Sequence, residues 1–67
     1  MNIYFDEKSD AVFIRLNESK KIADSCEVEK GVVLDFDDKG EVIGIEILNV
    51  KKRIPLQQLK ELKFKIA

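Results

Sequence analysis

The sequence predicts an α+β fold: a five-stranded, twisted antiparallel β-meander with one C-terminal α-helix. Residues 2 to 50 contain short runs of alternating apolar and polar residues separated by turn-forming residues, which is typical of antiparallel strands. From residue 55 the apolar residues recur every three or four positions instead, which is the period of an amphipathic helix. The 67 residues contain no internal repeat or linker, so residues 1 to 67 are expected to form a single small domain.

The five predicted strands are rich in β-branched and aromatic residues, which fit a pleated, half-buried surface. They cover residues 2–6, 11–16, 21–29, 31–37 and 41–48. Alternation places fourteen apolar residues on one face of the sheet, which we call the main face: Ile3, Phe5, Val12, Ile14, Leu16, Ile22, Cys26, Val28, Val32, Leu34, Phe36, Ile43, Ile45 and Ile47.

The predicted helix covers about residues 55–64. Pro55 suits its first position, where the missing N–H would have no partner inside the helix. The helix is about 10 Å across, whereas five strands make a sheet roughly 20–24 Å wide. The helix therefore cannot cover the whole main face, so the sheet must curl strongly or a second molecule must cover the rest. The predicted apolar stripe of this segment is Leu56, Leu59, Leu62 and Ile66.

The stretch DFDDKGEVIGIE, residues 35–46, is similar to an EF-hand calcium loop. Its flanks alternate with period two, however, whereas an EF-hand loop lies between helices. Its fifth position is Lys39, a cation where calcium needs an oxygen ligand. We therefore expect no metal site. The positions that match the calcium loop are Asp35, Asp37, Gly40 and Glu46.

We interpret the same stretch as a β-hairpin with the four-residue loop 37–40, which pairs Phe36 with Glu41. This register places Asp35 and Glu46 about 14 Å apart, too far to share one ion. The residues expected to have a structural role in the turn are Asp37 and Gly40.

The composition argues against an enzyme. The chain has no histidine, no glycine-rich phosphate loop and no base beside its serines, so neither catalytic residues nor a cofactor are expected. The single cysteine, Cys26, is expected to be a buried small hydrophobic residue. A lone thiol, the lack of a signal peptide and the lack of a run of ~18 apolar residues predict a cytoplasmic protein with no membrane contact.

Charge is segregated along the chain. Residues 1–50 have a net charge of −6, and residues 51–67 have a net charge of +5. The basic cluster Lys51, Lys52 and Arg53 is a candidate contact surface for an acidic partner or a nucleic acid. The simpler alternative is a solvated helix face attracted to the acidic body. No exposed aromatic stack accompanies the cluster, and the acidic body would repel phosphate, so nucleic-acid binding is the less favoured function.

The second face of the sheet mixes apolar residues with Arg15, Asp35 and Glu46. A curled small sheet could partly bury both faces, or the second face could contact another molecule. Because a chain of this size without disulfide or metal often gains stability by association, we expect a homodimer or a small protein partner. The candidate interface residues are Tyr4, Phe13, Val33, Val42, Gly44 and Leu48, where Gly44 would permit close backbone approach.

From about residue 2 to residue 53, the sequence resembles the domain of unknown function 2283 family of small prokaryotic proteins. The resemblance rests on YFDEKSDAVFIRL, on EVEKGVVLDFDDKGEVIGIEIL and on NVKKR, in this order. It implies a compact β-meander with a C-terminal helical element, no established activity and no catalytic residues. Some members are encoded beside small candidate toxins, which implies an antitoxin-like role. The expected function is therefore a non-enzymatic protein-interaction module.

Overall fold

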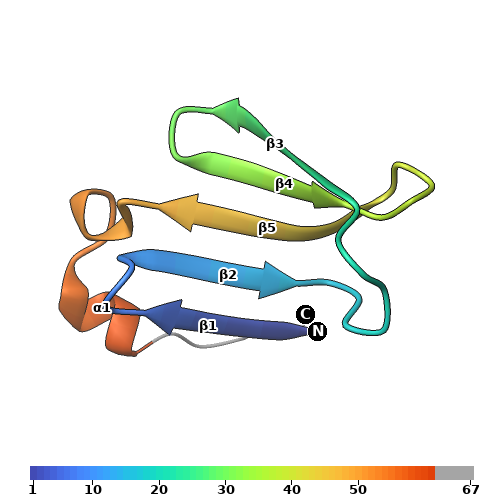
Figure 1. Ribbon diagram of the computed structural model, residues 1–67. Helices are drawn as coiled ribbons and strands as arrows, with labels where there is room; N and C mark the ends of the chain where they lie inside the picture. Colours follow the sequence, from blue (N-terminus) through green and yellow to red (C-terminus); the bar gives the residue numbers. More distant parts are fainter. Residues whose placement is uncertain (62–67) are drawn as a thin grey trace, which may run out of the picture.

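A computed structural model describes residues 1–61 of the chain. It contains a five-stranded antiparallel sheet followed by two short helical segments (Figure 1). The predicted α+β class, with its C-terminal α-helix, is confirmed. The elements are β1 (Asn2–Asp6), β2 (Ala11–Arg15), β3 (Asp24–Glu29), β4 (Val32–Phe36), β5 (Val42–Leu48), the 3₁₀ helix η1 (Val50–Lys52) and α1 (Leu56–Lys60). None of these helices is long and apolar enough to cross a membrane, within the described residues.

The strands are arranged in the order β1-β2-β5-β4-β3. β1 and β2 form one hairpin, whereas β3, β4 and β5 are successive neighbours. The two units are joined because β5 pairs with β2, with Val12 opposite Ile47 and Ile14 opposite Ile45. β3 is therefore an edge strand and does not lie beside β2. A meander of successive strands would place β3 beside β2. Alternation predicts which face a side chain takes but not which strand lies next to it, so it could not determine this order.

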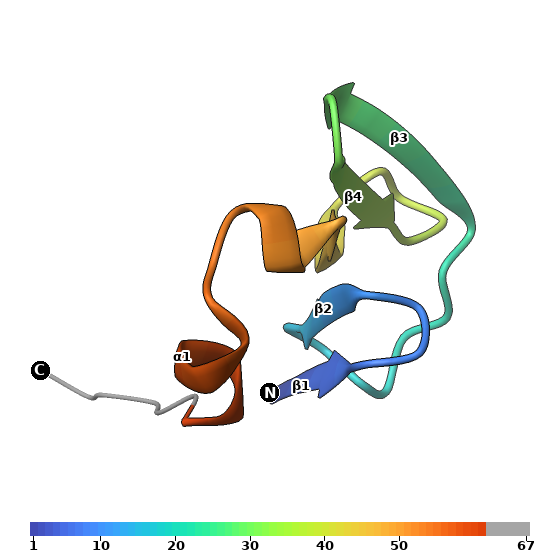
Figure 2. The ribbon, with the colours of Figure 1, turned by 90° about the vertical axis from the view of Figure 1, so that its left-hand side faces the viewer.

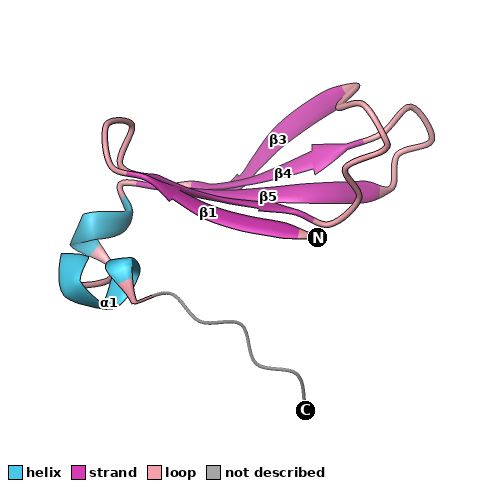
Figure 3. Ribbon diagram, turned by 90° about the horizontal axis from the view of Figure 1, so that it is seen from below, coloured by secondary structure: helices cyan, strands magenta, loops and turns pink. Residues whose placement is uncertain are grey.

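The C-terminal segment covers one side of the main face. Val12, Val50 and Leu59 form a buried cluster there. Half-buried residues of β1, β2 and β5 pack against it, so this cluster is the centre of the core. Figure 3 views the sheet close to its edge and shows η1 and α1 on the same side of it. Figure 2 shows α1 beside β1, at the opposite edge of the sheet from β3.

The helix α1 differs from its prediction at both ends. Pro55 precedes the helix as its cap, with ψ of 141°, and its carbonyl accepts the N–H of Leu59 at 3.1 Å. The last helical residue is Lys60, and Glu61 follows in a turn. The remainder of the predicted helix, and with it Leu62 and Ile66 of the predicted stripe, lies outside the described residues.

The part of the main face over β3 and β4 is open. All six residues of β3 are exposed, and the inward residues of β4 are only half-buried. Cys26, which is aligned with Leu34 on β4, is exposed, so the expectation that it is buried was wrong. An inward position leads to burial only where another layer lies over it, and α1 lies over β1 at the far edge. We call this surface the open face and define it by Cys26, Leu34, Phe36 and Ile45.

Candidate functional site

The β4–β5 hairpin closes with a three-residue loop. The N–H of Asp37 donates to the carbonyl of Glu41 at 2.9 Å, and the N–H of Gly40 donates to the carbonyl of Asp37 at 3.1 Å. Gly40 has φ of 81°, in the left-handed region. This pattern is a hairpin loop of three residues ending in a glycine. The predicted four-residue loop, with Phe36 opposite Glu41, is therefore wrong.

A β-bulge follows the turn and restores the facing of the apolar residues. Phe36 is opposite Val42, but Asp35 is opposite Gly44, so Ile43 is an extra residue on β5. Beyond the bulge, Leu34 is opposite Ile45. A shorter loop plus a bulge shifts the pairing by two residues relative to the predicted register. Beyond the bulge, such a shift keeps the side chains on their predicted faces, which is why the apolar pattern did not reveal the bulge. Val42, on the turn side of the bulge, is instead opposite Phe36 of the main face.

Asp37 holds the turn with its side chain. It is 4% exposed, and its Oδ1 accepts the N–H groups of Lys39 and Glu41, each at 2.9 Å. Its Oδ2 accepts a hydrogen bond from the ammonium of Lys20 at 3.2 Å. The N–H of Glu41, helped by Lys20, holds the pKa of Asp37 below its ordinary value. The sequence predicted a structural role for Asp37 in the turn, but not the link to Lys20 in the loop before β3.

Replacing Gly40 by valine should lower the free energy of unfolding by about 1–3 kcal/mol, because a β-branched residue resists positive φ. No heavy atom lies within 4 Å of the position that a Cβ would take, so the cost comes from the backbone conformation and not from a clash. Urea unfolding would measure it. The neighbouring variant Lys39→Ala should be nearly neutral, and equal midpoints for Gly40→Val and wild type would contradict the turn assignment.

The candidate interface residues lie mainly in rows across the second face. Tyr4 on β1 is opposite Phe13 on β2, and their rings stack with centroids 5.3 Å apart. Phe13 is opposite Glu46 on β5, which is opposite Val33 on β4. Leu48 is opposite Ala11 in another row. Val42 stands apart from these rows, beside the bulge, and is 40% exposed.

Gly44 makes room for a buried carboxyl group. It lies between Arg15 on β2 and Asp35 on β4, and Asp35 is 2% exposed. A Cβ at Gly44 would lie 3.0 Å from Oδ2 of Asp35, closer than nine in ten real Cβ contacts. The hydroxyl of Ser25 on β3 donates to Oδ1 of Asp35 at 2.7 Å. The missing side chain of Gly44 therefore accommodates a group of the chain itself.

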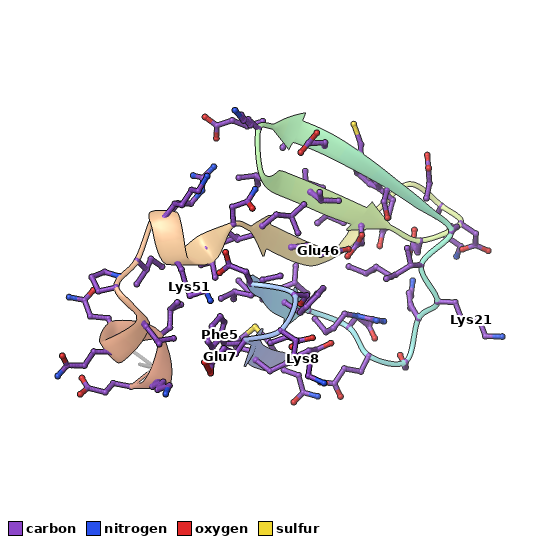
Figure 4. The ribbon with its side chains drawn as sticks, turned by 60° about the vertical axis from the view of Figure 1, so that its left-hand side comes forward. Phe5, Glu7, Lys8, Lys21, Glu46 and Lys51 are labelled. Atoms are coloured by element: carbon purple, nitrogen blue, oxygen red, sulfur yellow. The ribbon has the colours of Figure 1, made fainter. Side chains whose placement is uncertain are left out.

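Glu46 lies near Asp35 on the second face, so the predicted separation of about 14 Å is wrong. The shorter loop and the bulge together place Asp35 opposite Gly44, only two residues from Glu46 on β5. Burial, followed by the hydrogen bond and the charge of Asp35, raises the pKa of Glu46 above its ordinary value. Figure 4 shows Glu46 over the middle of the sheet. Within residues 1–61, no group of three or more His, Cys, Asp or Glu side chains is arranged to hold a metal ion.

The basic cluster forms an ordered turn at one end of the sheet. Asn49, with φ of 51°, precedes η1, and Oδ1 of Asp10 accepts the backbone N–H of Lys51 at 2.9 Å. The side chains of Lys51 and Lys52 are exposed. The guanidinium of Arg53 donates to the carbonyl of Lys30 at 2.6 Å, which ties η1 to the β3–β4 turn. Of the three predicted contact residues, Arg53 therefore has a structural use.

The family comparison covers the whole sheet. A family model described as "Protein of unknown function (DUF2283)" matches residues 2–51, which include all five strands, the β4–β5 turn and the pair of Asp35 and Glu46. Neither a search of curated proteins nor a search of solved structures found a match. The match confirms the resemblance seen in the sequence, and the chain belongs to the DUF2283 family of proteins of unknown function.

Proposed function

We propose that this chain is a non-enzymatic protein-interaction module, and that its open face binds a second copy of the same chain. The observation that carries the proposal is the exposed β3–β4 half of the main face. Apolar strand residues that solvent reaches on one side are a feature of contact surfaces. Cys26, Leu34, Phe36 and Ile45 occupy that surface, away from the cluster around Leu59.

The small core supports association. Domains of this size bury only about 60% of their unfolded surface and are marginal without help. Covering the open face with a second molecule would remove further apolar area from water, at about 25 cal/mol per Å². The buried hydrophobic residues within residues 1–61 are Ala11, Val12, Ile43, Val50 and Leu59.

Charge favours a second copy as the occupant. β3 exposes Asp24 and Glu29, whereas the C-terminal segment exposes Lys51, Lys52 and Lys60. A twofold arrangement would bring the acidic β3 of each copy toward the basic segment of the other, twice over. Pairing β3 directly with the β3 of a second copy would oppose like charges, so we assign the contact to the open face and not to the strand edge.

The family resemblance adds an antitoxin-like role, in which a small toxin would occupy the same open face in place of the second copy. Among the described residues, the basic cluster is poorly suited to nucleic acid, since Arg53 donates to the carbonyl of Lys30 and Glu29 of β3 lies close by. The proposal therefore commits to protein contacts.

The single thiol provides a direct test, because Cys26 lies on the open face and is exposed. The rate of maleimide labelling of Cys26 should fall as the chain is concentrated, since the second copy would cover it. The matched control is Tyr4→Cys in a Cys26→Ser background, because Tyr4 is 50% exposed on the second face. Its labelling rate should not depend on concentration.

Two results would overturn this assignment. If only the thiol at position 4 is protected, the contact lies on the second face, among the interface residues that the sequence suggested. If Cys26 is protected at low concentration by the product of an adjacent gene, and not by more of the chain itself, the occupant is a different protein.

A further inference from the structure

The second face contains two carboxyl groups, those of Asp35 and Glu46, that have few hydrogen bonds and no ion pair among the described residues. Asp35 is 2% exposed, and its Oδ1 accepts a hydrogen bond from the hydroxyl of Ser25 at 2.7 Å. The missing side chain of Gly44 leaves the space that Oδ2 of Asp35 fills. Glu46 is half-buried beside it. Neither carboxyl group takes part in an ion pair with another described residue. The ion pairs among residues 1–61 join Met1 to Glu18 and Lys20 to Asp37.

The charged groups on the flanking strands make other contacts. Arg15 on β2 is the nearest cation by register; its Nη2 donates to the carbonyl of Lys20 at 3.0 Å, and its Nε is buried with no hydrogen-bond partner among the described residues. On β3, the carboxylate of Glu27 accepts the N–H of Gly31 at 3.1 Å and adds a further negative charge on the same face. From β1 and β2, the aromatic rings of Tyr4 and Phe13 reach this face next to Glu46. Among the described residues, the hydroxyl of Ser25 is the one hydrogen-bond donor to either carboxyl group, so a proton on Glu46 would have Asp35 as its acceptor.

We propose that Asp35 and Glu46 share a proton, and that this pair makes the attachment of β4 to β5 sensitive to pH. With one proton present, the carboxyl of Glu46 donates a hydrogen bond to the carboxylate of Asp35 across the two strands. With none, two neighbouring carboxylates repel each other in a partly buried site. Because β4 and β3 carry the open face, loss of the proton loosens the part of the sheet that has no helix over it.

The direction in which stability changes with pH follows from the direction in which the pKa of Glu46 is shifted. The pKa of Glu46 is raised above its ordinary 4.5 in the folded chain, mainly by burial. Its contribution to stability is therefore complete below that value and is lost as the pH rises through the raised pKa. Asp37 acts in the opposite sense, because its pKa is lowered, so it loses its contribution as the pH falls. A matched variant is needed to separate the pH dependence caused by Glu46 from that caused by Asp37.

Glu46→Gln is that variant, because the amide can donate to Asp35 at every pH. Thermal unfolding of the purified chain should give similar midpoints for Glu46→Gln and wild type near pH 4.5. At pH 8 the midpoint of the variant should exceed that of wild type by roughly 4–8 °C. Glu7→Gln removes the same charge from the β1–β2 turn, where Glu7 lies apart from Glu46 in Figure 4, and should show no such divergence.

A constant difference between Glu46→Gln and wild type at the two pH values would overturn the proposal. A second measurement keeps the proposal testable if the variant unfolds. Carbonyl NMR of the wild-type chain should show Glu46 titrating above the ordinary range for glutamate, and Asp35→Asn should move that titration back toward it. An ordinary titration of Glu46 in wild type would exclude a shared proton. Both readouts use the free chain, so they do not depend on the proposed contact with a second copy.

Discussion

Replacing Leu59 by alanine should lower the free energy of unfolding by about 2–5 kcal/mol, the usual range for a leucine in a core. Leu59 is 3% exposed and is the residue of α1 that belongs to the buried cluster with Val12 and Val50. Removing its side chain leaves a cavity between the C-terminal segment and the sheet. The short helix has little intrinsic stability of its own, so its attachment depends on this contact.

The matched control is Gln57→Ala in the same helix, where the side chain is exposed. Alanine has a high helix propensity, so this change should leave the urea midpoint nearly unchanged. Equal losses from Leu59→Ala and Gln57→Ala would contradict the assignment of Leu59 to the core.

Replacing Gly44 by valine should also be strongly destabilising, by about 2–4 kcal/mol, because overpacking is combined with displacement of a buried carboxylate. The new Cβ would lie 3.0 Å from Oδ2 of Asp35 and 3.3 Å from the carbonyl oxygen of Ile14. The carbonyl belongs to the paired strand β2 and cannot move freely.

A double-mutant cycle with alanine separates the contact of the new Cβ with Asp35 from its contact with the carbonyl of Ile14. Gly44→Ala should cost less in an Asp35→Ala background than in wild type, because the closest atom has been removed. Urea unfolding of the four proteins would give the coupling energy. Additive losses would mean that Gly44 is required for reasons other than space for Asp35.

The strands and the position of the turn, though not its length, could be predicted because local pattern determines them. Alternating apolar residues define which side chains share a face, and the glycine at position 40 marks the one place in the β4–β5 loop where φ is positive. The strand order could not be predicted in this way, since alternation is the same whichever strand lies alongside. The exposure of Cys26 follows from that order, because it places β3 at the edge of the sheet.

The carboxyl pair was missed for a related reason. The assumed regular register separated Asp35 from Glu46. The three-residue loop and the extra residue Ile43 together bring them close. The signal that could have found the pair is Gly44, a residue without a side chain in the middle of a strand that is otherwise bulky, two positions before Glu46.

Sedimentation equilibrium of the wild-type chain tests the central claim most directly, namely that the open face takes a second copy. At tens of micromolar the fitted mass should be that of two chains, and it should fall toward one chain, 7.7 kDa, on dilution. Cys26→Glu should weaken the dimer, because it would place an unpaired charge in the contact. A mass of one chain at every concentration would contradict the claim, as would a dimer that Cys26→Glu leaves unchanged.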